Sequence, residues 1–445
     1  MKKSLLWIVV LLLSMSMFTV FSLAGCKPAV AEEEVVAEEE VVEEEVVEEV
    51  EEVALSGQVE VFSWWTAGGE AEGLQAMIDI FNEKYPDVEF INATVAGGAG
   101  FEAKPVLISR MTGGDPPDSF QVHAGHELID TWGVGDFLEP VNFIFEEEGW
   151  YDVYPEAMIS ILSMGDDILS VPVNIHRSNV LWYNKAVFKD NGIEAPTTFD
   201  EFFAAADALE AAGITPLALG DTGIWAAVHL FENVLLGVVG PDDYIGLMDG
   251  SVRWDSDGVK EAIQTFIDLL DYVNDDHSAL GWDEAAQYVI DGTAACTIMG
   301  DWAHGYFMSK GLTPDVEYGY VPVPGTSGIF MALSDTFCLP KDAPNRDAAI
   351  AWLKICGSKE GQDAFNPLKG SIPSRTDADI SLYDVYLKSA IDDFGTNIIT
   401  PSIAHGAAVS ETWSVAIGDV ITLLVANKDV DAAAAALQAA ADENL

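Results

Sequence analysis

Short apolar runs with the pattern of β-strands alternate with longer runs of helical periodicity from about residue 57 onward. The first series pairs "VEVFSWW" with "EGLQAMIDIFNEKYP", "VEFINATV" with "AKPVLISRMTGG" and "DSFQVHAG" with "HELIDTWG". A second series begins near "LSVPVNIHRSNVLWYNKAVF". Such alternation is typical of an α/β fold with a mainly parallel sheet. Two series predict two α/β bodies, and ligand sites favour the cleft between such bodies.

The N-terminus has the pattern of an exported lipoprotein, with a cationic start, a long apolar run and small residues before Cys26. We therefore expect a lipoprotein signal peptide over residues 1–25 and a lipidated Cys26. The mature protein would lie outside the cytoplasm, in the periplasm or at the cell surface, anchored by its lipid to a bacterial membrane. An uncleaved membrane anchor is the alternative, because the apolar run approaches the ~18 residues that span a bilayer.

Residues 26–56 contain the repeat "AEEEVVAEEEVVEEEVVEEVEEV". Its composition favours a self-repelling acidic linker that holds the body away from the membrane, and a partner-binding helix is the alternative.

The formal net charge of −54 argues against nucleic acid and anionic lipid headgroups as ligands, because both require a basic surface. The ligand is expected to be neutral or cationic, and the protein to be a monomer. Hydrophobic residues make up 49% of the chain, which is enough for a large core. Cys296, Cys338 and Cys356 have no metal-like spacing and, being odd in number, cannot all pair, so we expect buried apolar thiols.

Five separated segments, in order, resemble one known family: "FSWWTAGGEAEGLQAMIDIFNEKYPDVEF", "GGDPPDSFQVHAG", "VPVNIHRSNVLWYNKAVFKDNGIEAPTTFDEF", "MGDWAHGYF" and "GSKEGQDAFNPLKGSIPSR". They are similar to the family 1 extracellular solute-binding proteins of ABC sugar importers, and most of all to the glucose/mannose-binding proteins. The resemblance covers about residues 57–445.

The resemblance implies an α/β, two-lobed periplasmic-binding-protein fold of type II, like maltose-binding protein, with three crossovers between the lobes. Lobe 1 would comprise 57–170 and 334–376, lobe 2 would comprise 175–328 and 384–445, and the hinge segments would be 171–174, 329–333 and 377–383. It also implies ABC transporter permease subunits as partners and no enzymatic activity.

A monosaccharide presents apolar C–H faces, which suit an aromatic plate, and a rim of hydroxyls, which suits short charged or imidazole groups. Trp64 and Trp65 follow a strand, on which neighbouring side chains point to opposite faces. By resemblance, Trp65 contacts the ligand and Trp64 belongs to the core or the cleft wall. Glu70 would accept sugar hydroxyls, or alternatively be an exposed residue at a helix N-terminus.

Other polar residues are expected around the same ligand. Gln121 and His123, two apart on a strand, share one face. At the first crossover, Asn174, His176 and Arg177 would either bind hydroxyls or lock the backbone between the lobes. Asp301 and Trp302 resemble the acceptor and the aromatic plate of lobe 2. By resemblance the ring is completed by Asp335, Lys369 and His405, with Lys369 pairing with Asp335; a solvated loop charge is the alternative for Lys369. Trp225 is a weaker candidate, because its spacing from His229 is more typical of a helix core.

The sequence thus predicts a binding protein that captures a neutral monosaccharide of the glucose, galactose or mannose type by hinge closure and delivers it to an ABC importer. A disaccharide or polyol ligand is one alternative. An exported glycoside hydrolase with paired carboxylates is another, although the chain has no GxSxG or HExxH motif. We expect no cofactor and no metal, since the pair His123 and His126 lacks an obvious third ligand.

Overall fold

The computed structural model describes residues 55–445. The predicted signal peptide, Cys26 and nearly all of the acidic linker lie outside the described residues. Within residues 55–445, no helix is both long enough and apolar enough to cross a membrane. Cys296, Cys338 and Cys356 are buried free thiols, which confirms the expectation from the sequence.

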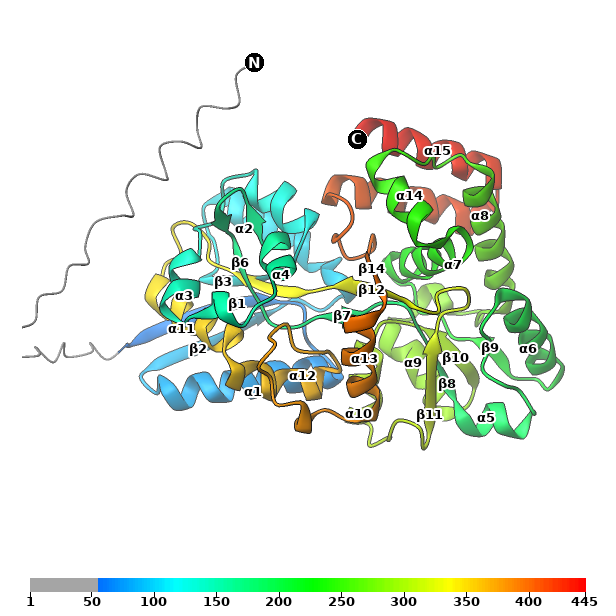
Figure 1. Ribbon diagram of the computed structural model, residues 1–445, viewed down its shortest axis with the longest axis horizontal. Helices are drawn as coiled ribbons and strands as arrows, with labels where there is room; N and C mark the ends of the chain where they lie inside the picture. The colour runs from blue at the N-terminus through cyan, green and yellow to red at the C-terminus, as the bar shows by residue number, and fades with distance from the viewer. Residues whose placement is uncertain (1–54) are drawn as a thin grey trace, which may run out of the picture. The chain divides into compact units, whose positions relative to one another are not determined.

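A five-stranded sheet organises the N-terminal part of the described chain (Figure 1). Its order is β2 (Val88–Thr94), β1 (Gly57–Ser63), β3 (Ser119–His123), β13 (Asp335–Cys338) and β6 (Ser170–Pro172). β1 is parallel to β2 and β3, as predicted, but β13 is antiparallel to β3 and β6. The sheet is mixed because β13 returns to it from a distant part of the chain and enters in the opposite direction.

Helices cover both faces of this sheet. In Figure 1, α1 (Gly68–Lys84) and α12 (Lys359–Lys369) lie below the strands and α2 (Ala103–Gly113) lies above them. α11 (Arg346–Gly357) brings Trp352 against Phe81 and Phe337, so the core between helices and sheet is aromatic. Smaller elements complete this half: η1 (Gly98–Gly100), η2 (Glu127–Gly133), α3 (Asn142–Glu147), η3 (Trp150–Asp152), α4 (Glu156–Ile161) and the hairpin of β4 (Ser163–Met164) and β5 (Asp167–Ile168).

A four-stranded sheet organises the second half. Its order is β11 (Tyr318–Pro322), β8 (Val180–Asn184), β10 (Ala294–Ile298) and β9 (Thr215–Leu217), with β10 parallel to β9 and antiparallel to β8. The surrounding helices are α5 (Lys185–Asp190), α6 (Phe199–Ala211), α7 (Trp225–Asp249), α8 (Asp257–Leu269), η4 (Leu270–Tyr272), η5 (His277–Ala279), α9 (Trp282–Asp291) and α10 (Trp302–Ser309).

Local sequence explains where several of these helices begin and bend. Thr198 and Glu201 form a capping box at the start of α6, and the Ser256 side chain caps α8. α7 is interrupted at Gly240, where φ is 79°, and the following Pro241 has no N–H to donate. The interruption separates a buried N-terminal part of α7, which faces the site described below, from a more exposed C-terminal part.

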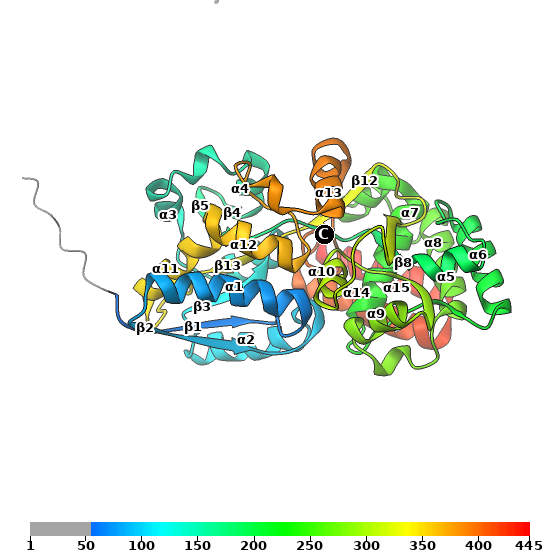
Figure 2. The ribbon, with the colours of Figure 1, turned by 90° about the horizontal axis from the view of Figure 1, so that it is seen from below.

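A three-stranded sheet lies between the two larger ones, in the order β14 (Ile398–Pro401), β12 (Ile329–Leu333) and β7 (His176–Arg177). Leu333 pairs with His176, and Ile175 forms a bridge with Ile372. Segments distant in sequence therefore meet between the large sheets. η6 (Ile380–Leu382), α13 (Val385–Thr396), α14 (Glu411–Asn427) and α15 (Val430–Asn444) follow; Figure 2 shows α14 and α15 on the side of the four-stranded sheet.

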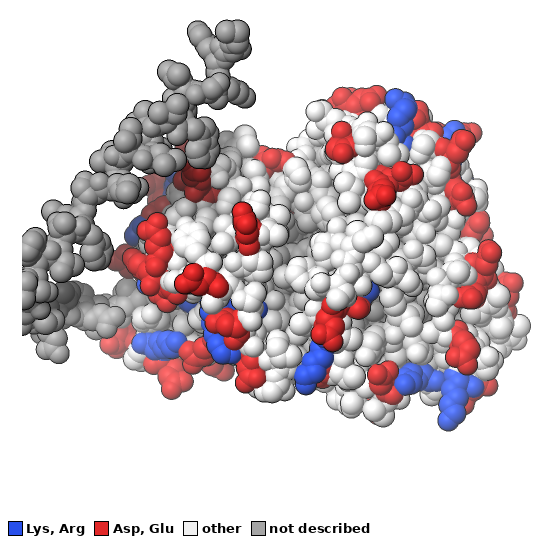
Figure 3. Space-filling model, viewed as in Figure 1, with Lys and Arg blue, Asp and Glu red and all other residues white. Residues whose placement is uncertain are grey.

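Acidic side chains are scattered over the face of the molecule in Figure 3, and basic side chains stand singly or in small groups among them. Many of the basic residues are engaged in ion pairs, such as Arg346 with Glu139 and Lys354 with Glu147. This face therefore offers no continuous basic surface of the kind that a nucleic acid requires.

Candidate functional site

A cavity of about 20 Å³ lies where the ends of β1, β3, β7 and β13 meet α7, α10 and α12. It has room for about one water molecule, far less than the ~300–1,000 Å³ of typical ligand pockets, so the two halves must move apart to admit a larger ligand. Most of the site residues predicted from the sequence line it: Trp65, Glu70, His123, His176, Trp225, Trp302, Asp335, Lys369 and His405. Gln121, Asn174, Arg177 and Asp301 do not line it. Trp64, Gly98, Ala99, Trp282 and Leu333 complete the wall.

Both adjacent tryptophans reach the cavity. β1 ends at Ser63, so the alternation of strand faces no longer applies to Trp64 and Trp65. Trp65 packs against Phe337 and Phe365, with ring centroids 5.6 and 4.8 Å away. Trp64 is tilted against His123 with the centroids 5.0 Å apart. Trp65 is thus fixed from behind by the core, which is what a rigid plate for a ligand requires.

Two neutral side chains fix Asp335, the first residue of β13. Gln121 Nε2 donates to Asp335 Oδ1 at 2.9 Å, and Asn174 Nδ2 donates to Oδ2 at 2.8 Å. Burial opposes the charge on Asp335, but its hydrogen bond to His176 and the charges of His176 and Lys369 hold its pKa below the usual range. Gln121 and Asn174 therefore act on the cavity through Asp335, which they hold as an ionised acceptor.

Lys369 ends α12 and faces the N-terminus of α1. The sequence predicted a pair with Asp335, but the ion pair that Lys369 forms is with Glu70, at 2.7 Å from Nζ to Oε1. Glu70 is in the first turn of α1, which packs directly against α12, so Glu70 is the acid that the ammonium reaches. Burial raises the pKa of Glu70, and Lys369 lowers it by less. The ammonium also lies 5.6 Å from the ring centre of Trp65 and 5.8 Å from that of Trp302.

His176 lies between two acids: Asp301, which directly precedes α10, and Asp335, the first residue of β13. Its Nδ1 forms a hydrogen bond with Asp301 Oδ1, and its Nε2 lies 3.2 Å from Asp335 Oδ2. Burial opposes protonation of His176, but Asp301 raises its pKa overall. Asp301 also accepts from the backbone N–H of Arg177 at 2.8 Å. Asp301 therefore lies behind His176 rather than in the cavity wall.

The Arg177 side chain extends away from the cavity. Its Nη1 donates to Asp393 Oδ2 at 2.5 Å, and its guanidinium lies 5.3 Å from the ring centre of Phe330. Phe330 is in β12 and Asp393 is in α13, so Arg177 links β7 to both of these elements. Of the two roles that the sequence left open, this placement favours locking the backbone.

His123 belongs to a chain of hydrogen bonds and ion pairs that leads away from the cavity. His123 Nδ1 lies 2.7 Å from Glu127 Oε2, and Lys104 Nζ lies 2.9 Å from the same oxygen. Lys104 also pairs with Glu411, in α14, at 3.0 Å. Burial alone would raise the pKa of Glu127, but Lys104 and His123 lower it overall. The wall of the cavity is thereby linked to an ion pair between α2 and α14.

His405 follows β14 and contributes the last imidazole. Burial, together with His123, His229 and Lys104, holds the pKa of His405 well below its ordinary value of 6.5. Its ring centroid lies 5.0 Å from that of Trp302 and 5.8 Å from that of Trp225. A neutral imidazole here can accept one hydrogen bond and donate another.

Sequence reasoning missed Trp282 and the backbone of Gly98. Trp282 is the first residue of α9, and nothing in its local pattern distinguishes it from a core residue. Gly98 has a clearer reason, because a Cβ there would lie 2.2 Å from Trp225. Only glycine lets this loop approach the indole so closely.

A second cavity of about 340 Å³ adjoins the first and shares Trp64, Glu70, Gly98, Trp225 and Trp282 with it. Glu102, Asp283 and Thr222 are among the residues on its outer side. The inner cavity therefore continues toward the surface on the side of Trp225 and Trp282.

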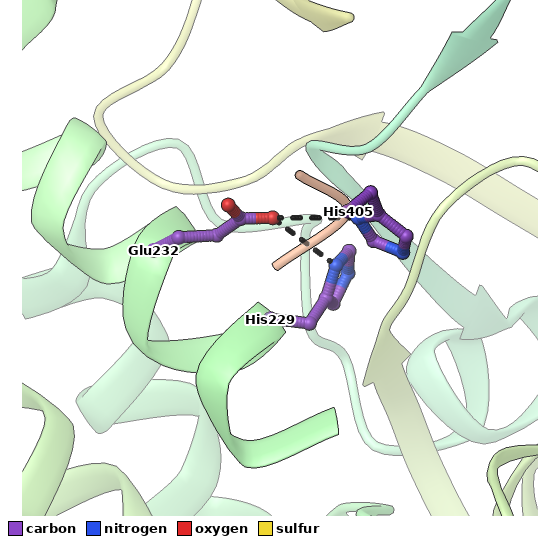
Figure 4. Close-up of side chains that lie close together, drawn as sticks. All are labelled: His229, Glu232 and His405. Atoms are coloured by element: carbon purple, nitrogen blue, oxygen red, sulfur yellow. Dashed lines mark ion pairs between the residues drawn. The ribbon is translucent and has the colours of Figure 1, made fainter. Parts of the chain in front are cut away.

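Among residues 55–445, one group of side chains has the spacing of a metal site: His229, Glu232 and His405, whose ligand atoms all lie within 4.8 Å of one another. Figure 4 shows the two histidines facing Glu232. The Glu232 oxygens already accept hydrogen bonds from the backbone of Ile403 and Ala404 and from Ser402. His126 lies at the surface beside Asp130.

Comparison with known proteins places the chain in a family. Residues 65–363 match the model of the bacterial extracellular solute-binding proteins. An ABC transporter extracellular-binding protein of Pyrococcus horikoshii, described as uncharacterized, is 41% identical over 85% of this chain and 86% of its own length. A probable sugar-binding periplasmic protein of Brucella suis is 35% identical over 82% of this chain and 87% of its own.

Solved structures give the fold. The bacterial solute receptor AcbH, described as preferring β-D-galactopyranose, superposes with a TM-score of 0.76 at 20% identity, over 87% of this chain and 98% of its own. Maltose-bound MalE3 of T. maritima has a TM-score of 0.73 at 18% identity, over 87% of this chain and 100% of its own. These matches confirm the predicted α/β periplasmic-binding-protein fold of the maltose-binding type. The chain belongs to the family of bacterial extracellular solute-binding proteins.

Proposed function

We propose that this protein captures a neutral monosaccharide of the glucose, galactose or mannose type outside the cytoplasm and delivers it to the permease subunits of an ABC importer. One observation carries the proposal: the cavity combines several indole rings with a rim of carboxylate, imidazole and ammonium groups. The relatives are binding proteins, one of them a probable sugar-binding periplasmic protein, so the proposal contains no catalytic step.

The charges of the cavity favour a neutral ligand. Lys369 is paired with Glu70, and His176 lies between Asp301 and Asp335. A charged ligand would have to break one of these pairs, and a buried charge left without its partner is costly. A hydroxyl can instead donate to one partner and accept from another without disturbing the pair.

Trp65 and Trp302 are proposed to hold the two sides of the sugar. Trp65 belongs to the half built on the five-stranded sheet and Trp302 begins α10 in the other half. Contact with both halves would favour the closed arrangement over an open one, which is how a ligand shifts such an equilibrium. We also propose that lobe 1 comprises 57–170 and 334–376 and that lobe 2 comprises 175–328 and 384–445. The hinge segments would be 171–174, 329–333 and 377–383.

Binding should be measured by calorimetry on the chain that begins at residue 27, against D-glucose, D-galactose, D-mannose, D-xylose, maltose and sorbitol. We expect a Kd in the micromolar range, about −8 kcal/mol, for at least one monosaccharide. A protein that binds none of the sugars would refute the proposal.

A disaccharide is the second candidate, because the adjoining cavity of about 340 Å³ shares Trp64, Trp225 and Trp282 with the first and has room for a second ring. In the same panel, at least tenfold tighter binding of maltose than of every monosaccharide would favour this alternative.

The lipid anchor is a separate part of the proposal. The sequence before Cys26 supports processing and lipidation of that residue. Expression of the full chain in a bacterial host should place it in the membrane fraction, and Cys26→Ser should release it or leave the signal uncleaved. Equal lipid labelling of both proteins would contradict the anchor at Cys26.

A further inference from the structure

Glu232, in the buried part of α7, is a carboxylate with no access to solvent. Its Oε2 accepts from the backbone N–H groups of Ile403 and Ala404, at 2.6 and 3.0 Å. Its Oε1 accepts from the hydroxyls of Ser402 and Ser178, at 2.8 and 3.2 Å. Four donors converging on two oxygens are what an ionised carboxylate needs, because it can only accept.

These donors explain why the group in Figure 4 is not assigned as a metal site. The Oε1 of Glu232 lies 3.5 Å from His229 Nδ1 and 3.9 Å from His405 Nδ1. A metal ion at that position would need the lone pairs that the serine hydroxyls use. Zinc sites also require at least three protein ligands free to coordinate.

Ser402 connects Glu232 to His405. A serine hydroxyl has one hydrogen, and the anionic Glu232 is the stronger acceptor for it. Ser402 Oγ also lies 2.8 Å from His405 Nδ1. With its own hydrogen directed at Glu232, the hydroxyl must accept from His405, and Nδ1 must carry the proton of that ring.

We propose that Glu232 is a positioning residue that acts through Ser402 to hold His405 in the Nδ1–H tautomer, so that Nε2 accepts a hydrogen bond from a hydroxyl of the bound sugar. The hydrogen bond from the sugar to Nε2 rests on the proposed function, whereas the tautomer of His405 concerns the protein without its ligand. Among the hydrogen bonds of residues 55–445, none uses Nε2 of His405, and His405 lines the cavity.

The surroundings support a neutral ring with a defined tautomer. Burial and the neighbouring His123, His229 and Lys104 keep the pKa of His405 well below its ordinary value. His229 has a similar link to Glu232. Ser178 Oγ lies 3.3 Å from His229 Nδ1 and donates to Glu232 Oε1. One carboxylate thus orients two imidazoles, of which only His405 lines the cavity.

The substitution Glu232→Gln tests the relay because it reverses the direction of the hydrogen bonds. The Gln oxygen must face the N–H groups of Ile403 and Ala404, so its NH₂ group faces Ser402 and donates to it. The Ser402 hydroxyl then donates to His405 Nδ1, and His405 must become the Nε2–H tautomer. Nε2 of His405, an acceptor in the wild type, thereby becomes a donor in the cavity.

The tautomer can be read from the imidazole nitrogen shifts in ¹⁵N-edited NMR spectra of the protein without sugar, assigned with His405→Asn. We expect the Nδ1–H form in the wild type and the Nε2–H form in Glu232→Gln. Calorimetry with the tightest-binding of D-glucose, D-galactose and D-mannose should show affinity about tenfold lower, as one unsatisfied hydroxyl would cause.

Ser178→Ala is the matched control, because it removes a donor to Glu232 on the side of His229 and leaves Ser402 in place. It should keep His405 in the Nδ1–H form. An Nε2–H form in the wild type, or an unchanged Nδ1–H form in Glu232→Gln, would overturn the proposal. The wild-type spectrum tests the predicted Nδ1–H tautomer of His405 even if Glu232→Gln fails to fold. If the wild type binds none of these sugars, the proposed function is refuted. The NMR spectra of the protein without sugar still report the tautomer of His405 in that case.

Discussion

Trp65 has a core side and a cavity side at once. Phe337 and Phe365 hold one side of the ring, while the indole also lines the cavity below the Lys369 ammonium. Its exposed fraction is only 1%, which would be equally typical of a purely structural tryptophan. Burial alone therefore does not distinguish a tryptophan that only packs in the core from one that stacks on a ligand. Substitution of Trp65 distinguishes the two roles.

Replacement of Trp65 by Ala should weaken sugar binding by ~1–3 kcal/mol, because a stacked aromatic face and its buried area are lost. Trp65→Phe keeps an aromatic plate and should lose less. Calorimetry on both variants, with circular dichroism to confirm folding, measures the difference. An affinity unchanged in Trp65→Ala would make Trp65 a structural residue only.

His405 should make the protein sensitive to mild acid. Its pKa is held below the ordinary value of 6.5, so below about pH 6.5 the unfolded chain binds a proton that the native state refuses. The free energy of unfolding then falls as the pH drops, by up to ~1.4 kcal/mol per pH unit for one proton. His176, whose pKa is raised, acts in the opposite direction: its contribution is complete below its ordinary pKa of 6.5 and is lost as the pH rises.

Urea denaturation at pH 7.0 and 5.5 measures how much His405 contributes to the pH dependence of the free energy of unfolding. His405→Asn should lose less stability than the wild type over this interval. The same or a steeper loss in the variant would show that His405 does not cause the acid sensitivity.

Of the residues that line the cavity, His123 was expected there from its place on a strand, whereas Trp65 and Asp335 were expected only through the family resemblance. The partners that set their properties were not predictable. Glu232 reads as an ordinary helix residue, and only the fold brings it within hydrogen-bonding distance of Ser402, 170 residues away. The pair of Lys369 with Glu70 likewise depends on the packing of α12 against α1.

At the scale of elements, α10 packs closely against the C-terminal end of α12. A Cβ on Gly305, in α10, would lie 2.3 Å from the carbonyl oxygen of Lys369. α10 belongs to the half of the four-stranded sheet and α12 to the half of the five-stranded sheet. Gly305 therefore permits a close contact between elements that flank the cavity.

Gly305→Ala should prevent this contact and hold α10 and α12 apart. Because inserted methyl groups in tight packing cost ~1–3 kcal/mol, we expect sugar affinity to fall about tenfold or more while the chain stays folded. Gly395→Ala, in α13 where nothing lies within 4 Å of the new Cβ, is the control. Equal affinities of the two variants would exclude a role for the Gly305 contact in binding.

Sequence patterns predicted elements such as β1, β2, β3, α1 and α2 but not the return of β13 into the first sheet. Local periodicity identifies a strand, whereas its partner and direction depend on contacts far apart in sequence, here Phe337 with Gln121 and Val171. The three crossovers were expected only through the family resemblance, since no local pattern marks them.

At the scale of the whole molecule, an ion pair joins the two halves outside the cavity. Lys104 in α2 pairs with Glu411 in α14, and their side chains are 14% and 24% exposed. Because Lys104 also pairs with Glu127, which contacts His123, the pair is linked to the cavity wall. We expect it to favour the closed arrangement.

Glu411→Gln should weaken sugar binding by about 1 kcal/mol, as expected for a partly buried pair, and more so at low salt. Small-angle scattering without sugar should show a larger mean radius than in the wild type. Glu360→Gln, which breaks the exposed pair with Lys84 within one half, should change neither quantity. If both variants bind like the wild type, the Lys104–Glu411 pair does not contribute to closure.

The central claim is that a single neutral sugar occupies the cavity between the two halves. A crystal structure determined with the tightest-binding monosaccharide tests it most directly. We predict one pyranose ring in contact with Trp65 and Trp302, with hydroxyls on Asp335, Lys369 and His405. A sugar bound elsewhere, with these side chains in contact only with one another, would contradict the account.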